Sequence, residues 1–159
     1  MDKKINIFLD DCRFPDEANC SFTFTRLSEL SGIDNEDWII VRSVEEFKQA
    51  LELHGMPDNV SFDHDLDYGK ENVHIKEYFR ACEQNRPLNR YVLKNTGLEA
   101  AQALIEFCKK NGLTLPKYFI HSANHLGADD ILNELKQYEG FAKSLQSGSS
   151  RQKPSRYPC

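Results

Sequence analysis

The stretch Lys4–Asp11, KINIFLDD, decides the fold that this sequence predicts. Its apolar run is too short for a helix, and its Ile and Phe residues favour a buried β-strand that ends at an acidic pair. Three similar runs follow: WIIV at 38–41, NVSF at 59–62 and KYFI at 117–120. Helical patterns separate most of them, which indicates parallel pairing through right-handed crossovers. The sequence therefore predicts an α/β domain.

Capping signals delimit the predicted helices. Ser43 begins one helix and Gly55 ends it, whereas Thr96 begins a longer helix that Gly112 ends. A last helix is expected over 128–138. The segment 12–37 contains a strand-like FTFT and a weak helical LSELSG.

These patterns predict one domain over 1–143 with a charged insertion at about 67–93. Within the insertion we expect one helix around 74–82, followed by a loop. Residues 144–159 are small, polar and proline-bearing, and this composition predicts a disordered tail.

Composition narrows the class of protein. The chain has 159 residues and a net charge of -5, which argues against binding to long duplex nucleic acid but permits a nucleotide or an RNA end. No apolar run reaches the roughly 20 residues that span a bilayer, and residues 1–4 lack a secretory signal. Five cysteines without a CxxC pair indicate reduced thiols. We expect a cytoplasmic protein with no membrane contact.

Reactive side chains follow three of the four predicted strands. They are Asp10 and Asp11, then Asp63, His64 and Asp65, then His121 and Ser122. In an open parallel sheet, ligands bind outside the carboxyl ends of the strands. These residues are therefore predicted to share one site, although polar residues also serve simply to end strands.

The residue types in this set suit hydrolysis of a phosphodiester. Imidazoles titrate near neutral pH, so His64 and His121 are candidates for the acid and the base, with Asp63 as the third catalytic candidate. Clustered carboxylates bind hard cations such as Mg²⁺ or another divalent cation. The predicted metal ligands are Asp10, Asp11 and Asp65, with Asp63 as an alternative third oxygen; Asp10, Asp11 and Asp63 are equally candidates for orienting the imidazoles.

Other residues near the strand ends are candidates for holding a phosphate. These candidates comprise two cations, a helix start with free backbone N–H groups, and neutral donors. They are Arg13, Lys94, Thr96, Gly97, Ser122 and Asn124. For Thr96 and Gly97, the plain alternative is an ordinary helix cap.

Four motifs in this order resemble the cyclic-phosphate processing receiver (cREC) domain family: IFLDDCRFP, VSFDHDL, the Thr-Gly pair of NTGLEAA, and IHSANHLG. The resemblance spans about residues 4–138. It implies a degenerate response-regulator receiver fold, a three-layer Rossmannoid of the receiver or flavodoxin type. Its central parallel sheet would have four to five strands in the order 2-1-3-4. It also implies action on cyclic phosphates, such as RNA 2′,3′-cyclic ends.

The receiver comparison extends to single residues. Asp10 and Asp11 match the receiver acidic pair, Asp63 matches the phosphoacceptor, and Ser122–Ala123 resemble the pair of a hydroxyl and a small residue. The fifth receiver strand with its lysine has no clear match, which argues against phosphorelay signalling. Asp130 stands where an asparagine is expected, and an acid there weakens an anion site.

Three functions are therefore open at this point. The first is a hydrolase, a cyclic phosphodiesterase that acts on a nucleotide or an RNA end. The second is a non-catalytic module that binds or sequesters a cyclic nucleotide. The third is a receiver that accepts phosphate on Asp63. The oligomeric state is not predicted.

Overall fold

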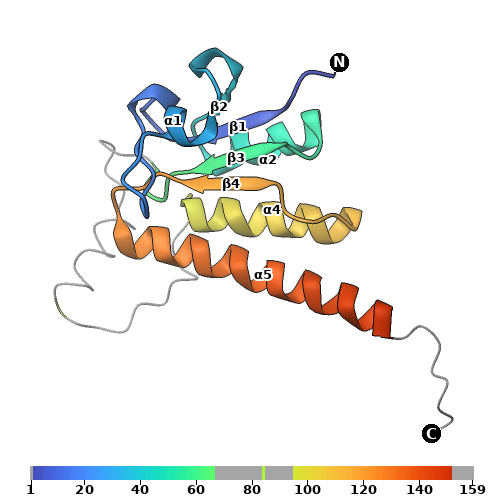
Figure 1. Cartoon of the computed structure of the whole chain (residues 1–159). Coiled ribbons are helices and arrows are strands. Elements are labelled where there is room, and N and C mark those ends of the chain that lie inside the picture. Colours follow the sequence, from blue (N-terminus) through green and yellow to red (C-terminus); the bar gives the residue numbers. More distant parts are fainter. Residues whose placement is uncertain (1, 67–83, 85–94, 152–159) are drawn as a thin grey trace, which may run out of the picture.

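Four parallel strands form the centre of the computed structural model, which describes residues 2–66, 84 and 95–151. They are β1 (Asn6–Leu9), β2 (Ile39–Val41), β3 (Asn59–Phe62) and β4 (Lys117–Ile120) (Figure 1). Their order is β2-β1-β3-β4, which confirms the predicted order. Leu9 pairs with Val41 and Phe62, and Phe62 pairs with Ile120, so the strands end level at one edge.

Among the described residues, three helices cover one face of the sheet, called here the helical face: α2 (Val44–His54), α4 (Gly97–Asn111) and α5 (His125–Arg151). Ser43 caps α2 by accepting the Glu46 N–H, as predicted, and Gly112 ends α4 with a φ of 63°. Every second strand residue points toward these helices. The largest fully buried side chains of this core are Ile7, Leu9, Phe47, Leu51, Phe62, Leu66, Leu104, Ile131 and Leu135.

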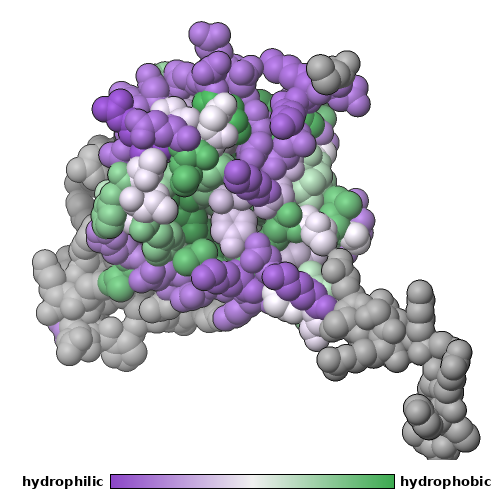
Figure 2. Space-filling view, in the orientation of Figure 1, coloured by the Kyte–Doolittle hydropathy of each residue, from purple (hydrophilic) through white to green (hydrophobic). Residues whose placement is uncertain are grey.

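The intervening strand residues point to the opposite face, called here the thin face. They pack under η1 (Pro15–Glu17), α1 (Leu27–Ser31) and their connecting loops; η2 (Asn35–Asp37) leads into β2. This smaller core consists of Phe8, Ala18, Cys20, Leu27, Trp38 and Phe119. Figure 2 shows that apolar side chains form part of the surface, with hydrophilic residues on either side of them. Phe14, Phe22, Phe24 and Leu30 of this layer are each at least 43% exposed.

The structure corrects two predicted elements. The FTFT stretch, residues 22–25, is part of a turn, because Phe24 has a φ of 56° and its N–H donates to the Cys20 carbonyl. The last helix was predicted over 128–138, and α5 is longer at both ends. Residues 144–151, predicted to be disordered, continue that helix, because Ala142, Lys143 and the nearby Leu and Gln residues are good helix formers.

The helix expected around 74–82 and the last residues of the predicted tail lie outside the described residues. The ends of the four described strands, and with them most of the predicted site residues, lie within the described part of the chain. None of the described helices combines the length and the apolar character that crossing a membrane requires.

Candidate functional site

Three strand ends bring their reactive side chains together on the thin face. Residues two apart on a strand share a face; Asp10 thus follows Phe8, Asp63 follows Ser61, and His121 follows Phe119. Arg13 joins them from the loop after β1, and Asp10, Arg13, Asp63 and His121 are called here the strand-end cluster. Asp10, Asp63 and His121 are each at most 5% exposed.

Asp10 accepts four hydrogen bonds. Its Oδ1 accepts the backbone N–H groups of Cys12, at 2.9 Å, and Arg13, at 2.8 Å. Its Oδ2 lies 2.7 Å from Arg13 Nε and 3.2 Å from His121 Nε2. Burial alone raises the pKa of Asp10, but the bonds from His121, Arg13 and Cys12 outweigh it and hold this pKa well below its usual range.

His121 is enclosed and has partners at both ring nitrogens. Its ring stacks on Phe8 with centroids 4.5 Å apart and an interplanar angle of 8°. Because the Asp10 carboxylate only accepts, Nε2 donates to it, and Nδ1 accepts from the Ser61 hydroxyl at 2.7 Å. Burial lowers the pKa of His121, although Asp10 opposes this. The ring is therefore neutral near pH 7 and 1% exposed, so it meets a substrate only if one of these bonds breaks.

Arg13 bridges two carboxylates. Its Nη2 lies 3.2 Å from the His121 carbonyl and 3.5 Å from Asp63 Oδ1, in addition to the Nε bond to Asp10. Arg42 supports the loop, because its Nη1 donates to the carbonyls of Arg13, at 2.6 Å, and Asp10, at 3.0 Å. Sequence reasoning missed Arg42; the only signal was its place directly after the second strand.

Asp63 is a buried carboxyl whose ionised form is energetically unfavourable. Burial and the neighbouring Asp10 and Asp65 charges raise its pKa to about 7, against the opposing effect of Arg13 and the 2.8 Å bond from the His64 N–H. At neutral pH this carboxyl therefore exchanges a proton readily, which is the property required of a general acid or base.

His64 lies on the helical face, away from the ring of His121. Its Nδ1 is 2.7 Å from Asp65 Oδ1, which also accepts from Asn124 Nδ2 at 3.1 Å. Gly127 of α5 lies against the imidazole so closely that a Cβ there would approach His64 Cγ to 2.3 Å. The predicted His64 and His121 pair thus follows adjacent strands, but the contacts described for the two rings lie on opposite faces of the sheet.

Most of the predicted phosphate ligands have structural contacts. Thr96 caps α4 by accepting the Glu99 N–H at 3.4 Å, and Gly97 donates its N–H to the His64 carbonyl at 2.8 Å. Ser122 Oγ accepts the Asn124 N–H at 3.1 Å. The plain helix-cap alternative therefore describes Thr96 and Gly97, and their contact with phosphate stays a prediction. Lys94 lies outside the described residues.

The predicted metal ligands are divided between two places. Among the described residues, Asp10, Asp11 and Cys12 have potential ligand atoms within 4.8 Å of one another. Asp65 is not in that group and binds His64 instead. Desolvation and the charges of Asp11 and Asp10 raise the pKa of Cys12 to about 11, so its thiol stays protonated and is a poor metal ligand. These residues fit a resident divalent cation poorly.

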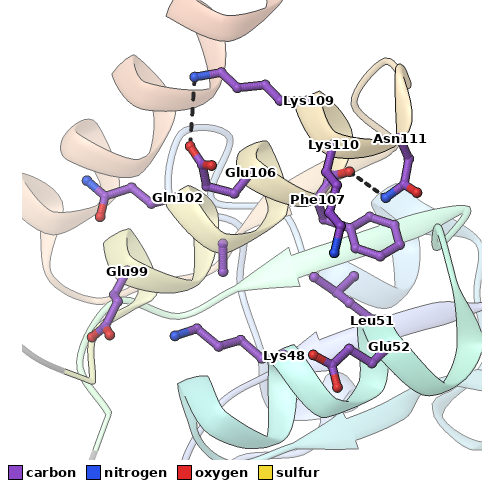
Figure 3. A pocket seen from close by; sticks show the side chains of 11 residues that line it. Lys48, Leu51, Glu52, Glu99, Gln102, Glu106, Phe107, Lys109, Lys110 and Asn111 are labelled. Carbon is purple, nitrogen blue, oxygen red and sulfur yellow. Dashed lines mark hydrogen bonds and ion pairs between the residues drawn. The ribbon is translucent and has the colours of Figure 1, made fainter.

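A groove of about 930 Å³ lies elsewhere, between α2 and α4 (Figure 3). Its walls carry both signs of charge, from Lys48 and Glu52 on α2 to Glu106 and Lys109 on α4. No residue of the strand-end cluster lines it. We therefore place the candidate site at the strand ends rather than in this groove.

Comparison with known proteins agrees with this geometry. The family model for the cyclic-phosphate processing receiver domain matches residues 5–137, which include all four strands and the strand-end cluster. Among curated proteins and among solved structures, nothing matches significantly. The sheet order, the acidic strand ends and the extent of this match lead to one conclusion: the chain belongs to the family of cyclic-phosphate processing receiver domains.

Proposed function

We propose that this chain is a phosphoesterase that hydrolyses cyclic phosphates of nucleotides or RNA ends at the carboxyl edge of its sheet. The observation that carries the proposal is Asp63, a buried carboxyl with a pKa raised to about 7 that lies 3.5 Å from the guanidinium of Arg13. A group that is half protonated at neutral pH, beside a fixed positive charge, suits proton transfer at a phosphate.

The reaction requires two proton transfers. A water attacks phosphorus and gives up a proton to a base, one ring P–O bond breaks, and the leaving oxygen receives a proton from an acid. In this proposal Asp63, which lies on the same face as Arg13, takes the proton of the attacking water and then gives it to the leaving oxygen. His64 lies on the other face, where Asp65 fixes its ring by accepting at Nδ1. Arg13 holds the phosphate oxygens through the N–H groups that it does not use within the cluster.

In this proposal His121 acts as a positioning residue. It donates to Asp10, which in turn holds Arg13. This role differs from the direct acid or base role that the sequence suggested for His121, and it follows from the partners at both of its ring nitrogens.

The test is a substrate screen with the whole chain. The protein is incubated with 2′,3′-cyclic nucleotides and with cyclic dinucleotides, and the products are separated by chromatography. We expect a phosphomonoester product, a loss of rate of about 100-fold or more in Asp63→Asn, and a smaller loss in His64→Gln, whose ring lies on the other face. His54→Gln is the matched control, because His54 is an exposed residue at the end of α2. Full activity in a folded Asp63→Asn variant excludes the proposed role.

A second candidate, a module that binds a cyclic phosphate without turnover, is favoured by one observation. Asp10 and His121 are fully engaged with protein partners, and such a closed network suits holding an anion better than cycling protons. Calorimetry that shows saturable binding, with the cyclic ligand recovered intact after long incubation, would select this function. The receiver alternative predicts that a small phosphodonor labels the wild-type chain and not Asp63→Asn.

A further inference from the structure

The carboxylate of Asp10 has no acceptor position left for a metal ion. A carboxylate offers about four lone-pair positions. The Oδ1 atom of Asp10 accepts two backbone N–H groups, and Oδ2 accepts from Arg13 Nε and from His121 Nε2, at distances of 2.7 to 3.2 Å. Asp10 is 0% exposed, so a hydrated cation has no direct approach to either oxygen. Coordination by Asp10 therefore requires that one of these four bonds break.

Arg13 already supplies the positive charge that clustered carboxylates need. Its guanidinium contacts Asp10 at 2.7 Å and Asp63 at 3.5 Å, so one cation spans both acids. An arginine stays protonated at every pH that a folded protein experiences. The side chain is 30% exposed, and Arg42 holds the Arg13 carbonyl at 2.6 Å. The Arg13 guanidinium is thus a fixed positive charge of the fold, and Arg42 holds the backbone of the same residue in place.

We propose that the Arg13 guanidinium takes the place of the divalent cation that the acidic pair of a receiver fold suggests. Arg13 neutralises Asp10 and holds Asp63, and the wild-type cluster takes up no Mg²⁺ or Mn²⁺ of its own. The two N–H groups of Nη1 have no partner among the described residues, which leaves a positive edge for a phosphate. This inference concerns cation binding and stands whether or not the chain hydrolyses a phosphodiester.

The test measures Mn²⁺ binding to the whole chain by electron paramagnetic resonance of the free ion, with no substrate present. We expect no saturable site in the wild type. Removing the guanidinium in Arg13→Ala leaves two carboxylates uncompensated, so a site should appear with affinity higher by about tenfold or more. That gained site should disappear in the double variant Arg13→Ala, Asp63→Asn. Arg13→Lys, which keeps a positive charge, is the matched control and should gain no site.

Thermal denaturation gives an independent measurement. The melting temperature of the wild type should be equal in EDTA and in MnCl₂, whereas that of Arg13→Ala should fall in EDTA and recover with Mn²⁺. Arg13→Gln provides a second variant if Arg13→Ala does not fold. One saturable Mn²⁺ per wild-type chain overturns the inference, whether Asp11 or Asp63 supports it. Failure of a folded Arg13→Ala or Arg13→Gln variant to gain a site overturns it as well.

Discussion

His121 on the thin face lies between an aromatic ring and a carboxylate, whereas His64 on the helical face lies against the backbone of α5 and beside a carboxylate that reaches water. Both histidine side chains are at most 3% exposed. Their acidic partners differ, because the Asp10 side chain is 0% exposed and that of Asp65 is 23% exposed. The two faces of one sheet therefore bury the same residue type in different dielectric surroundings.

This difference distinguishes the two imidazoles by how their acidic partners are solvated. On the thin face, Asp10, His121 and Ser61 form a closed chain of hydrogen bonds that keeps the imidazole neutral. On the helical face, the bonds from His64 and Asn124 hold the pKa of Asp65 below its usual value in spite of burial, and water screens the pair. Loss of the imidazole should therefore cost less in the second setting, because the partly exposed Asp65 carboxylate can be hydrated instead.

Replacing each histidine by alanine should show the largest contrast. His121→Ala removes one of the four donors to buried Asp10, leaves the buried Ser61 hydroxyl without its acceptor and opens a cavity beside Phe8. We expect it to lower the free energy of unfolding by about 4 kcal/mol. His64→Ala should cost about 2 kcal/mol, because partly exposed Asp65 recovers hydration. Urea denaturation followed by circular dichroism measures both values. Equal losses would show that the two faces do not differ in this respect.

The start of α4, which packs against the end of β3, should be nearly as sensitive to substitution as His121. A Cβ on Gly97 would lie 1.9 Å from the Asp63 carbonyl oxygen and 2.8 Å from His64 Cα, and both atoms belong to the backbone. Gly97→Ala must therefore push α4 away from the end of β3, at a cost of about 3 kcal/mol in unfolding free energy.

Gly140→Ala is the matched control for this substitution. Gly140 is also helical, but its added Cβ meets nothing within 4 Å. It should stabilise the chain by up to about 1 kcal/mol through helix propensity. A Gly97→Ala variant as stable as Gly140→Ala would mean that the close approach of α4 to Asp63 does not exist in solution.

Much of this architecture was predictable from sequence, because it depends on short-range patterns. Four apolar runs and their caps predicted the strands and helices, and the resemblance to the receiver family implied the strand order that is observed. Level parallel ends explain why Asp10, Asp63 and His121 meet. Strand alternation also contained the separation of the histidines: Asp63 and His64 are adjacent, so they point to opposite faces. The sequence therefore already indicated that His64 and His121 lie on opposite faces, but the prediction that they form a pair did not take this alternation into account.

Other features had no short-range signal. The bridge from Arg13 to Asp63 joins residues 50 positions apart through a long side chain, and sequence spacing does not specify which carboxylate such a side chain meets. Arg42 is similar, because its partners are backbone carbonyls. The length of α5 was underestimated because its last turns contain small polar residues, which are typical of tails as well as of helix ends.

The last expected effect concerns the pH dependence of stability, and it tests whether the Asp63 carboxyl is buried on the thin face as His121 is. Its pKa is raised from 3.8 to about 7 by folding. Between those values the folded state keeps a proton that the unfolded state has lost, so the stability contributed by Asp63 falls as pH rises and is constant above about pH 7.

Asp63→Asn cannot ionise, so it should gain stability relative to the wild type as pH rises from about 4 to about 8. Each unit of pKa shift corresponds to about 1.4 kcal/mol, and the relative gain should exceed about 2 kcal/mol. The lowered pKa of His121 makes stability rise with pH below 6.5, the opposite sign, but both proteins keep this histidine and its effect largely cancels in the difference. Urea denaturation of both proteins across this range measures the gain. A difference that is constant with pH would mean that Asp63 ionises as an ordinary exposed carboxyl does, and the contrast between the two faces would then rest on the histidines alone.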